Sequence, residues 1–279
     1  MDIATAPALS TGEPAFPHRD LARLSAAARR RILRFAADRA VHLGSSLSVV
    51  DVLVTVCRAA GLTPATVDDP GRDRLILSKG HAVWALYAVL GELGVLDTDG
   101  ADTAARLPGH PPEGLPGVDA ATGALGHGLS IGAGLAEAAR LGGRDRRTYV
   151  ILGDGELNEG SVWEAAMFAA HRGLGRLVAV VDVNGLQQDG PTADVLDLSP
   201  LDAKWRSFGW HVVEADGHDL AALADALDTA DAEPDRPTVV LAHTVKGRGV
   251  PFMEHDADWH VGSLDAGQLA TALRAVGDD

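Results

Sequence analysis

Two polar residues that follow apolar, valine-rich runs have the types needed to bind a metal ion and a diphosphate. Asp154 stands between Gly153 and Gly155 after "TYVIL", and Asn184 ends the run "RLVAVVDVN". A carboxylate and an amide oxygen are hard ligands that suit Mg²⁺ or Ca²⁺, with diphosphate oxygens and water completing the coordination. Each glycine turn alone would indicate no more than a tight turn. The combination, with a helix N-terminus expected just after Gly155, favours a diphosphate site.

Hydrophobic periodicity predicts the elements that position these residues. Short, continuously apolar segments alternate with amphipathic ones, which is typical of an α/β fold with a parallel sheet and helices on both faces. We expect strands at residues 74–78, 147–154, 176–184, 210–216 and 237–247. We expect helices at residues 20–41, from a cap at Ser46 or Ser48 to about 60, and at 81–94, 128–141, 160–172, 201–209, 219–230 and 264–275. Ligands of such sheets bind beyond the carboxyl ends of the strands, so Asp154 and Asn184 are expected side by side there.

Composition and charge exclude several classes of function. The chain has 279 residues, of which 46% are apolar and 23% charged, an ordinary composition for a soluble protein. The net charge of −15 argues against nucleic-acid and anionic-membrane partners, although backbone N–H groups and a metal could still neutralise a phosphate locally. Cys57 is the only cysteine, so an internal disulfide is excluded. No apolar run reaches the roughly 18 residues that suggest a membrane span.

The N-terminal segment and the lack of repeats in the rest of the chain indicate a tail followed by one domain. Residues 1–18 lack the basic region and apolar stretch of a signal peptide, so we expect a flexible N-terminal tail and a cytoplasmic protein. Residues 19–279 show no internal repeat and no low-complexity linker, which favours a single domain. Within it, the Pro- and Gly-rich stretch 97–123 is expected to be a long functional loop.

The pattern Gly-Asp-Gly followed later by Asn resembles the thiamine-diphosphate motif, and the rest of the chain resembles the N-terminal, diphosphate-binding half of the transketolase family. Six further segments match in the same order over residues 20–262: "HLGSSLSVVDVL", "RLILSKGHAVWALYAVL", "GHPPEGLPGVDAATGALGHGLSIGAGLAEA", "VNGLQQDGPT", "AKWRSFGWHVVEADGHD" and "HTVKGRGVPFMEHDADWH". The resemblance implies a thiamine-diphosphate-binding fold, with thiamine diphosphate and Mg²⁺ (or Ca²⁺) as cofactors. It also implies that the cofactor supplies the carbanion chemistry.

The same resemblance assigns cofactor residues. The metal ligands would be Asp154, Asn184 and the backbone carbonyl of Leu186. The cofactor site as a whole would comprise Gly123, Leu125, Gly126, Gly153, Asp154, Gly155, Glu159 and Asn184. In that set Gly153 and Gly155 line the diphosphate, and Glu159 matches a glutamate that the family places at the subunit interface.

Four histidines match the family's active-site set: His42, His81, His110 and His260. Breaking the C2–C3 bond of a ketose requires proton removal from the C3 hydroxyl, and histidine titrates near neutrality. The resemblance implies proton transfer by His42 and His260, binding of the C1 hydroxyl by His110, and a place for His81 near the diphosphate and the sugar.

Other basic residues have weaker claims. His127 stands where the family has Gln or His, and its role is left open between cofactor and interface. Lys79 and Lys246 could approach a phosphate, but solvated lysines are the commoner outcome and are expected here. The remaining histidines are interpreted as surface or packing residues: His18, His171, His211, His218, His243 and His255.

The resemblance also implies that the pyrimidine-binding half of a transketolase is supplied by another chain. Transketolases have a second, pyrimidine-binding domain that supplies an essential glutamate and most of the arginines that bind the substrate phosphate. We therefore expect one subunit of a two-component transketolase, inactive alone and completed by a separate C-terminal subunit, as an α2β2 assembly acting on small sugar phosphates. It would transfer a two-carbon ketol unit from a ketose to an aldose or aldehyde. The alternatives are an E1 α subunit of a 2-oxo-acid dehydrogenase and a non-catalytic thiamine-fold subunit; the donor, the acceptor and the pathway stay open.

Overall fold

A five-stranded parallel sheet forms the centre of the molecule, in a computed structural model that describes residues 18–99 and 106–277. The strands are β1 (Arg74–Leu77), β2 (Thr148–Gly153), β3 (Leu177–Val183), β4 (His211–Asp216) and β5 (Thr238–His243). Their order across the sheet is β1-β2-β3-β5-β4, and every neighbouring pair is parallel. The predicted α/β fold is confirmed.

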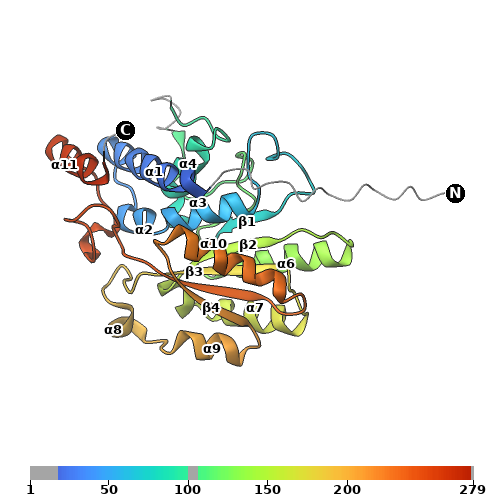
Figure 1. Cartoon of the computed structure of the whole chain (residues 1–279). Coiled ribbons are helices and arrows are strands. Elements are labelled where there is room, and N and C mark those ends of the chain that lie inside the picture. Colours follow the sequence, from blue (N-terminus) through green and yellow to red (C-terminus); the bar gives the residue numbers. More distant parts are fainter. Residues whose placement is uncertain (1–17, 100–105, 278–279) are drawn as a thin grey trace.

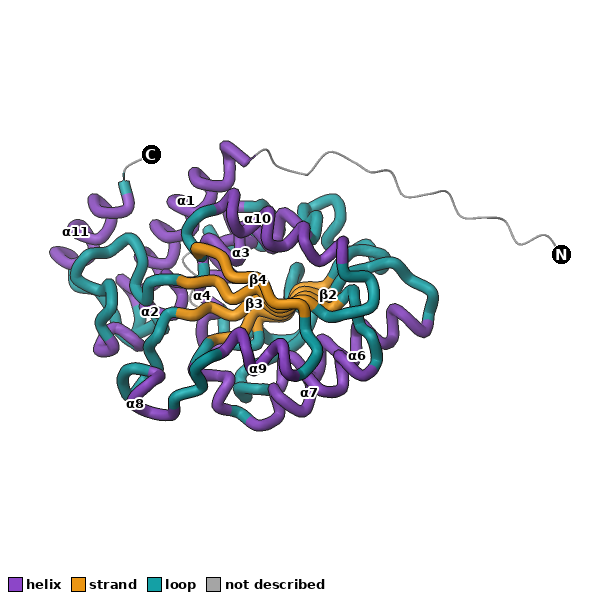
Figure 2. The backbone as a smooth tube through the Cα atoms, turned by 60° about the horizontal axis from the view of Figure 1, so that its bottom comes forward, coloured by secondary structure: helices purple, strands orange, loops and turns teal. Residues whose placement is uncertain are grey.

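Helices cover both faces of this sheet, as Figures 1 and 2 show. One face carries α1 (His18–Asp38), α3 (Val50–Ala59), α4 (Val83–Glu92) and α10 (Leu220–Asp228). The other face carries α6 (His127–Leu141), α7 (Gly160–His171) and α9 (Leu201–Ser207). Alternate residues of each strand point to opposite faces: Tyr149 and Ile151 belong to the first core, and Val150 and Leu152 to the second. Both faces of the sheet are therefore buried from solvent, which explains why the strands are continuously apolar.

The remaining elements lie around this three-layer body. They are α2 (Leu43–Ser48), α8 (Thr192–Leu196), α11 (Ala266–Val276) and the short 3-10 helices η1 (Gly80–Ala82), η2 (Gly155–Asn158), η3 (Thr229–Ala232) and η4 (Ala257–His260). The C-terminal α11 packs against α1. Among the described residues, no helix has both the length and the apolar character to cross a bilayer.

One sequence-based expectation about helices needs correction. The helix expected to start at a cap on Ser46 or Ser48 is two helices: α2 begins after His42, and α3 follows from Val50. Ser46 and Ser48 are fully buried inside α2, where the Ser48 hydroxyl binds a buried carboxylate instead of a free backbone N–H. The predicted tail at 1–18 lies outside the described residues, apart from His18, where α1 begins.

The strand register brings the two predicted metal-binding residues together. β2 and β3 are neighbours with Gly153 opposite Asp182, so Asp154 and Asn184 both follow at the carboxyl ends of these strands. The backbone N–H of Gly185 donates to Asp154 Oδ2 at 2.6 Å, which ties the two loops directly. The predicted placement of Asp154 and Asn184 side by side is confirmed.

Candidate active site

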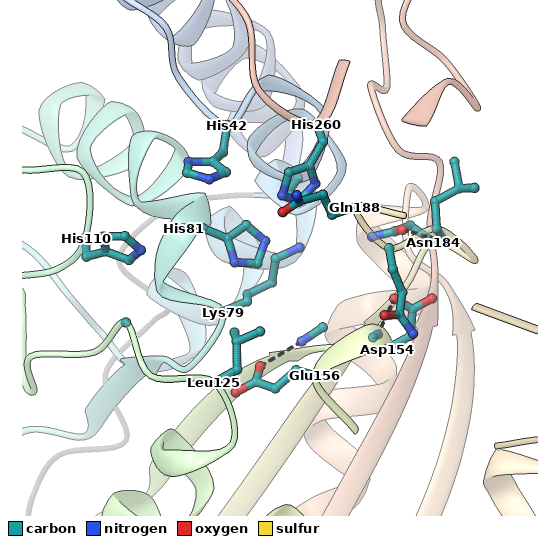
Figure 3. A pocket seen from close by; sticks show the side chains of 16 residues that line it. His42, Lys79, His81, His110, Leu125, Asp154, Glu156, Asn184, Gln188 and His260 are labelled. Carbon is teal, nitrogen blue, oxygen red and sulfur yellow. Dashed lines mark hydrogen bonds between the residues drawn. The ribbon is translucent and has the colours of Figure 1, made fainter. Parts of the chain in front are cut away.

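A pocket of about 280 Å³ lies at the carboxyl ends of the strands. Eleven of its sixteen lining residues are predicted site residues: His42, His81, His110, Gly123, Leu125, Gly153, Asp154, Gly155, Asn184, Leu186 and His260. The other five lining residues were not predicted as site residues: Ser45, Lys79, Glu156, Gln187 and Gln188. Figure 3 shows the histidines on one side of the pocket and Asp154 and Asn184 on the other.

The carboxylate of Asp154 is held in place by the backbone. Its Oδ1 accepts from Gly155 N at 2.8 Å, and its Oδ2 accepts from Gly185 N at 2.6 Å. The side chain is buried, and in the described part of the chain no basic side chain forms a hydrogen bond or ion pair with it. Burial, followed by the nearby Asp182 carboxylate, raises the pKa of Asp154 to about 6. The two backbone N–H groups and the nearby Lys79 only partly oppose this rise, so a bound cation would further stabilise the ionised carboxylate.

The neighbouring loop adds further oxygen atoms of the same kind. Asn184 Oδ1 accepts from Leu186 N at 3.1 Å, and Asn184 Nδ2 donates to Asp182 Oδ2 at 3.2 Å, so the amide has a fixed orientation. No group of three or more His, Cys, Asp or Glu side chains suited to a metal occurs in the described residues. One carboxylate, one amide oxygen and one carbonyl fit a Mg²⁺ ion that takes its remaining ligands from phosphate and water.

Lys79 and Lys246 are not solvated, contrary to the sequence-based expectation. Their exposed fractions are 1% and 0%. Lys246 Nζ donates to the carbonyl of Gln187 at 2.9 Å and reaches that of Leu186 at 3.4 Å. Burial, then the nearby Lys79, lowers the pKa of Lys246 to about 8. Both ammonium groups are anchored beside the pocket, where they add positive charge for an anionic ligand.

Asp182 lies beneath the pocket as a fully buried hub that the sequence analysis did not single out. It forms an ion pair with Lys79 and accepts hydrogen bonds from Ser48 (2.7 Å), Thr244 and Asn184 (3.2 Å). Burial alone would raise its pKa, but Lys79 and these donors hold the pKa below its usual value. A charged hub of this kind fixes four segments that converge on the site.

The glycine turn before α6 is fixed by a third buried carboxylate, Glu156. It accepts from Gly126 N at 2.8 Å, from Gly153 N at 3.1 Å and from the Ser78 hydroxyl. Gly126 has φ of 81°, and a Cβ there would lie 2.6 Å from Glu159 Cβ, so only glycine fits. Glu159 itself is exposed and does not line the pocket.

His127 follows this turn at the start of α6. Its side chain is exposed, and its Nδ1 lies 3.1 Å from the carbonyl oxygen of Leu125. It does not line the pocket.

Four histidines from separate segments share one wall. The ring centroids of His42 lie 5.3 Å from those of His81 and of His260, and 6.3 Å from that of His110. His81 and His260 are 5.5 Å apart. The Nδ1 atom of His260 is buried and has no hydrogen-bond partner among the described residues. An unpaired buried nitrogen requires an explanation, and a hydrogen bond to a bound ligand is one that suits a residue of the pocket lining.

Packing these rings together keeps three of them neutral. Burial, followed by neighbouring histidines and lysines, lowers the pKa of His42, lowers that of His260 to about 4, and lowers that of His81 further. At neutral pH each ring therefore carries one bare nitrogen that can accept a proton or a hydrogen bond.

The buried, neutral histidines should make the stability of the fold depend on pH. Below the ordinary histidine pKa of 6.5, the unfolded chain takes up a proton at residue 81 that the folded chain excludes. Because the unfolded state then binds more protons, the free energy of unfolding should fall as pH drops below 6.5. Denaturant titrations across this range should show a shallower fall for His81→Asn than for the natural chain. An unchanged slope would contradict the neutral assignment, and the exposed His255→Asn serves as control.

Some of the site residues that were not predicted do carry a signal in the sequence. Glu156 directly follows the Gly-Asp-Gly turn, and Asp182 interrupts an otherwise apolar strand, which is a signal for a buried charge with a partner. Lys79 immediately precedes the Gly80-His81 motif. Ser45 and Gln188 lie within two of the segments that match the transketolase family, but their residue types alone indicate no role, and only the tertiary structure brings them to the pocket.

Comparison with known proteins, like the geometry of the pocket, indicates a thiamine-diphosphate site. Residues 34–279 match the family described as "Transketolase, thiamine diphosphate binding domain". The chain is 39% identical over 245 residues to an apulose-4-phosphate transketolase subunit of Phocaeicola vulgatus, covering 86% of this chain and 87% of that protein. It is 42% identical over 219 residues to 6-deoxy-6-sulfo-D-fructose transketolase subunit SqwG of a Clostridium species, covering 76% and 80%.

Solved structures extend the likeness to the fold. A transketolase variant from Pichia stipitis matches with a TM-score of 0.81 and 31% identity, over 93% of this chain and 41% of that one. Transketolase from Leishmania mexicana matches with a TM-score of 0.79 and 27% identity, over 95% and 42%. This chain thus spans about two fifths of the length of these transketolases.

The chain belongs to the transketolase family and corresponds to its thiamine-diphosphate-binding domain. The resemblance inferred from the sequence is confirmed, and the chain is a transketolase-type enzyme subunit. The comparisons favour neither the 2-oxo-acid dehydrogenase alternative nor the non-catalytic one.

Proposed function

We propose that this chain is the thiamine-diphosphate-binding subunit of a two-component transketolase that moves a two-carbon ketol unit from a ketose to an aldose or aldehyde. The observation that carries the proposal is the pocket itself. The Asp154 carboxylate, Lys79 and a wall of four histidines line one space, and the buried Lys246 is anchored beside it by the Gln187 carbonyl. That arrangement combines a site for an anionic, metal-bound cofactor with hydroxyl-binding and proton-accepting groups.

Individual residues then take defined roles. Asp154, Asn184 Oδ1 and the Leu186 carbonyl would hold a Mg²⁺ ion, and Lys79 and Lys246 would add positive charge near the diphosphate. The loop backbone at Gly123 and Leu125 would border the rest of the cofactor, which supplies the carbanion chemistry when bound.

The histidines would act on the sugar. His42 and His260, with bare nitrogens at neutral pH, would take and return the proton of the C3 hydroxyl. His110 would bind the C1 hydroxyl, and His81 would hold the substrate near the diphosphate.

Relatives of similar length support a proposal for the substrate class. Their names specify ketoses that carry an anionic group, a phosphate in one and a sulfonate in the other. We propose an anionic ketose as the donor for this chain. We also propose that residues 19–279 form one domain in the cytoplasm.

The partner would be a separate C-terminal subunit in an α2β2 assembly, since the relatives of similar length are themselves named as subunits. Its docking surface is proposed to include the outer side of α7. Met167 and Phe168 are 50% and 44% exposed there, on the helix that follows the exposed Glu159. A partner covering this side would lie next to Glu159 and Ser161, which contact the Gly126 turn.

A charge placed on this surface should disrupt assembly. Met167→Glu is expected to weaken the association of the two subunits by about 30-fold or more, because an unpaired carboxylate would be buried at the interface. Analytical ultracentrifugation of the mixed subunits measures the change. The matched control is Leu141→Glu, a 71% exposed apolar residue at the far end of α6. Equal weakening by both substitutions, or by neither, would remove α7 from the proposed interface.

Identifying the proteins that co-purify with this chain tests the proposal as a whole. Tagged chain purified from its native cells should carry one stoichiometric companion with a pyrimidine-binding domain, identified by mass spectrometry. Lipoyl and flavin proteins as companions would contradict the transketolase assignment.

A further inference from the structure

His218 joins three elements that are distant in sequence. It lies in the turn between β4 and α10, and its side chain is only 9% exposed. Its Nδ1 lies 2.8 Å from Asp51 Oδ2 on α3, and its Nε2 lies 2.8 Å from the backbone nitrogen of Val245, just beyond β5. The sequence analysis gave it no function, and the pocket does not include it.

These two contacts define one tautomer. Val245 N can only donate, so Nε2 must be bare and the ring proton must be on Nδ1, where it is donated to Asp51. Asp51 is also bound by Arg29 through two hydrogen bonds of 3.1 and 2.6 Å. Burial would raise the pKa of Asp51, but His218 and Arg29 hold it well below its usual range. The carboxylate therefore stays ionised and selects the tautomer with the proton on Nδ1.

The segment that His218 holds leads directly into the site. Thr244 donates to the buried hub Asp182, and Lys246 Nζ donates to the Gln187 carbonyl at 2.9 Å. Val245 lies between these two residues and has its N–H bound by His218. The position of Val245 thus sets where the Lys246 ammonium lies relative to the loop that carries the proposed metal ligands Asn184 and Leu186.

We propose that His218 is a positioning residue for the cofactor site: held in one tautomer by Asp51 and Arg29, it fixes Val245 and with it the ammonium group of Lys246. The coupling itself is a property of the folded chain. Only its consequence for cofactor affinity rests on the proposed function.

The test combines a disrupting and a rescuing substitution. Asp51→Asn presents an amide N–H in place of a carboxylate oxygen, which favours the other tautomer and sets Nε2–H against Val245 N–H. The exchange of the Val245 and Lys246 amides, followed by mass spectrometry or NMR, should become about tenfold faster, as for the loss of one hydrogen bond. Long-range nitrogen NMR should show the His218 proton leaving Nδ1.

His218→Gln supplies the rescue. Its amide oxygen can take the place of Nε2 and accept from Val245 N–H whatever residue 51 is, so the double variant should return the exchange toward the natural rate. His218→Ala should not. The half-buried His211→Gln on β4 is the matched control and should leave the exchange unchanged. If Asp51→Asn does not fold, the contrast between His218→Gln and His218→Ala decides.

Unchanged exchange in His218→Ala, or failure of His218→Gln to restore it, would overturn the proposal. In the assembled enzyme, the disrupting variants should raise the activation constant for thiamine diphosphate about tenfold with little effect on kcat at saturation. If the natural enzyme shows no response to thiamine diphosphate, the proposed function fails, while the exchange experiment still decides on the positioning role.

Discussion

Replacing Asp154 by Asn should lower the affinity of the assembled enzyme for Mg²⁺ and thiamine diphosphate by at least about 100-fold, the upper end of what outer-shell changes at metal sites cost. The substitution keeps the size of the side chain but removes the charge that is buried without a basic partner in the described structure. It also places an amide N–H against Gly155 N or Gly185 N, so the loop itself loses support. Isothermal titration with and without Mg²⁺ measures both effects.

The control for Asp154→Asn is Asp189→Asn, an exposed acid in the neighbouring loop. It removes the same charge without touching the predicted metal ligands, and its affinity should stay within about twofold of the natural enzyme. Cofactor binding that is retained by Asp154→Asn and still depends on Mg²⁺ would show that the metal is held elsewhere.

The second large effect should come from the histidine wall. His42→Asn and His260→Asn are each expected to lower kcat by about 10²–10⁴, the usual contribution of general acid–base catalysis. Their rings lie at 90° with centroids 5.3 Å apart, so they face the same region of the pocket. Because they would handle one proton together, the double variant should lose much less than the product of the two single losses. Steady-state kinetics at saturating cofactor measures each value.

His255→Asn is a fitting control for this series. His255 is exposed and has φ of 62°, a conformation that asparagine tolerates. It should retain full activity. Normal kcat in both His42→Asn and His260→Asn would contradict the assignment of proton transfer to these residues.

The sequence predicted the framework of the site because its signals are local. Continuous apolar runs marked the strands, and the glycines around Asp154 marked the turn at the end of β2. Once the strands were known to be parallel, Asp154 and Asn184 had to lie at the same end of the sheet. The resemblance to transketolase then named the four histidines, and the structure brings all four to one pocket.

What the sequence could not show depends on burial and long-range contacts. Lys79 and Lys246 were expected in solvent because most lysines are, yet partners on other segments hold them inside. Ser46 or Ser48 was expected as a helix cap, but both are buried and Ser48 binds Asp182, which is 134 residues away. The role inferred for His218 likewise requires Asp51 and Val245 in place, and no spacing rule links those three positions.

The most direct test of the account is a reconstitution of activity from separate subunits. The purified chain, its companion and their mixture are each given Mg²⁺, thiamine diphosphate, an aldehyde acceptor and an anionic ketose labelled with ¹³C at its first two carbons. Only the mixture is expected to join both labelled carbons to the acceptor, and only with the cofactor present. Enzyme-like turnover by this chain alone, or labelled carbons that do not move together, would contradict the proposed function.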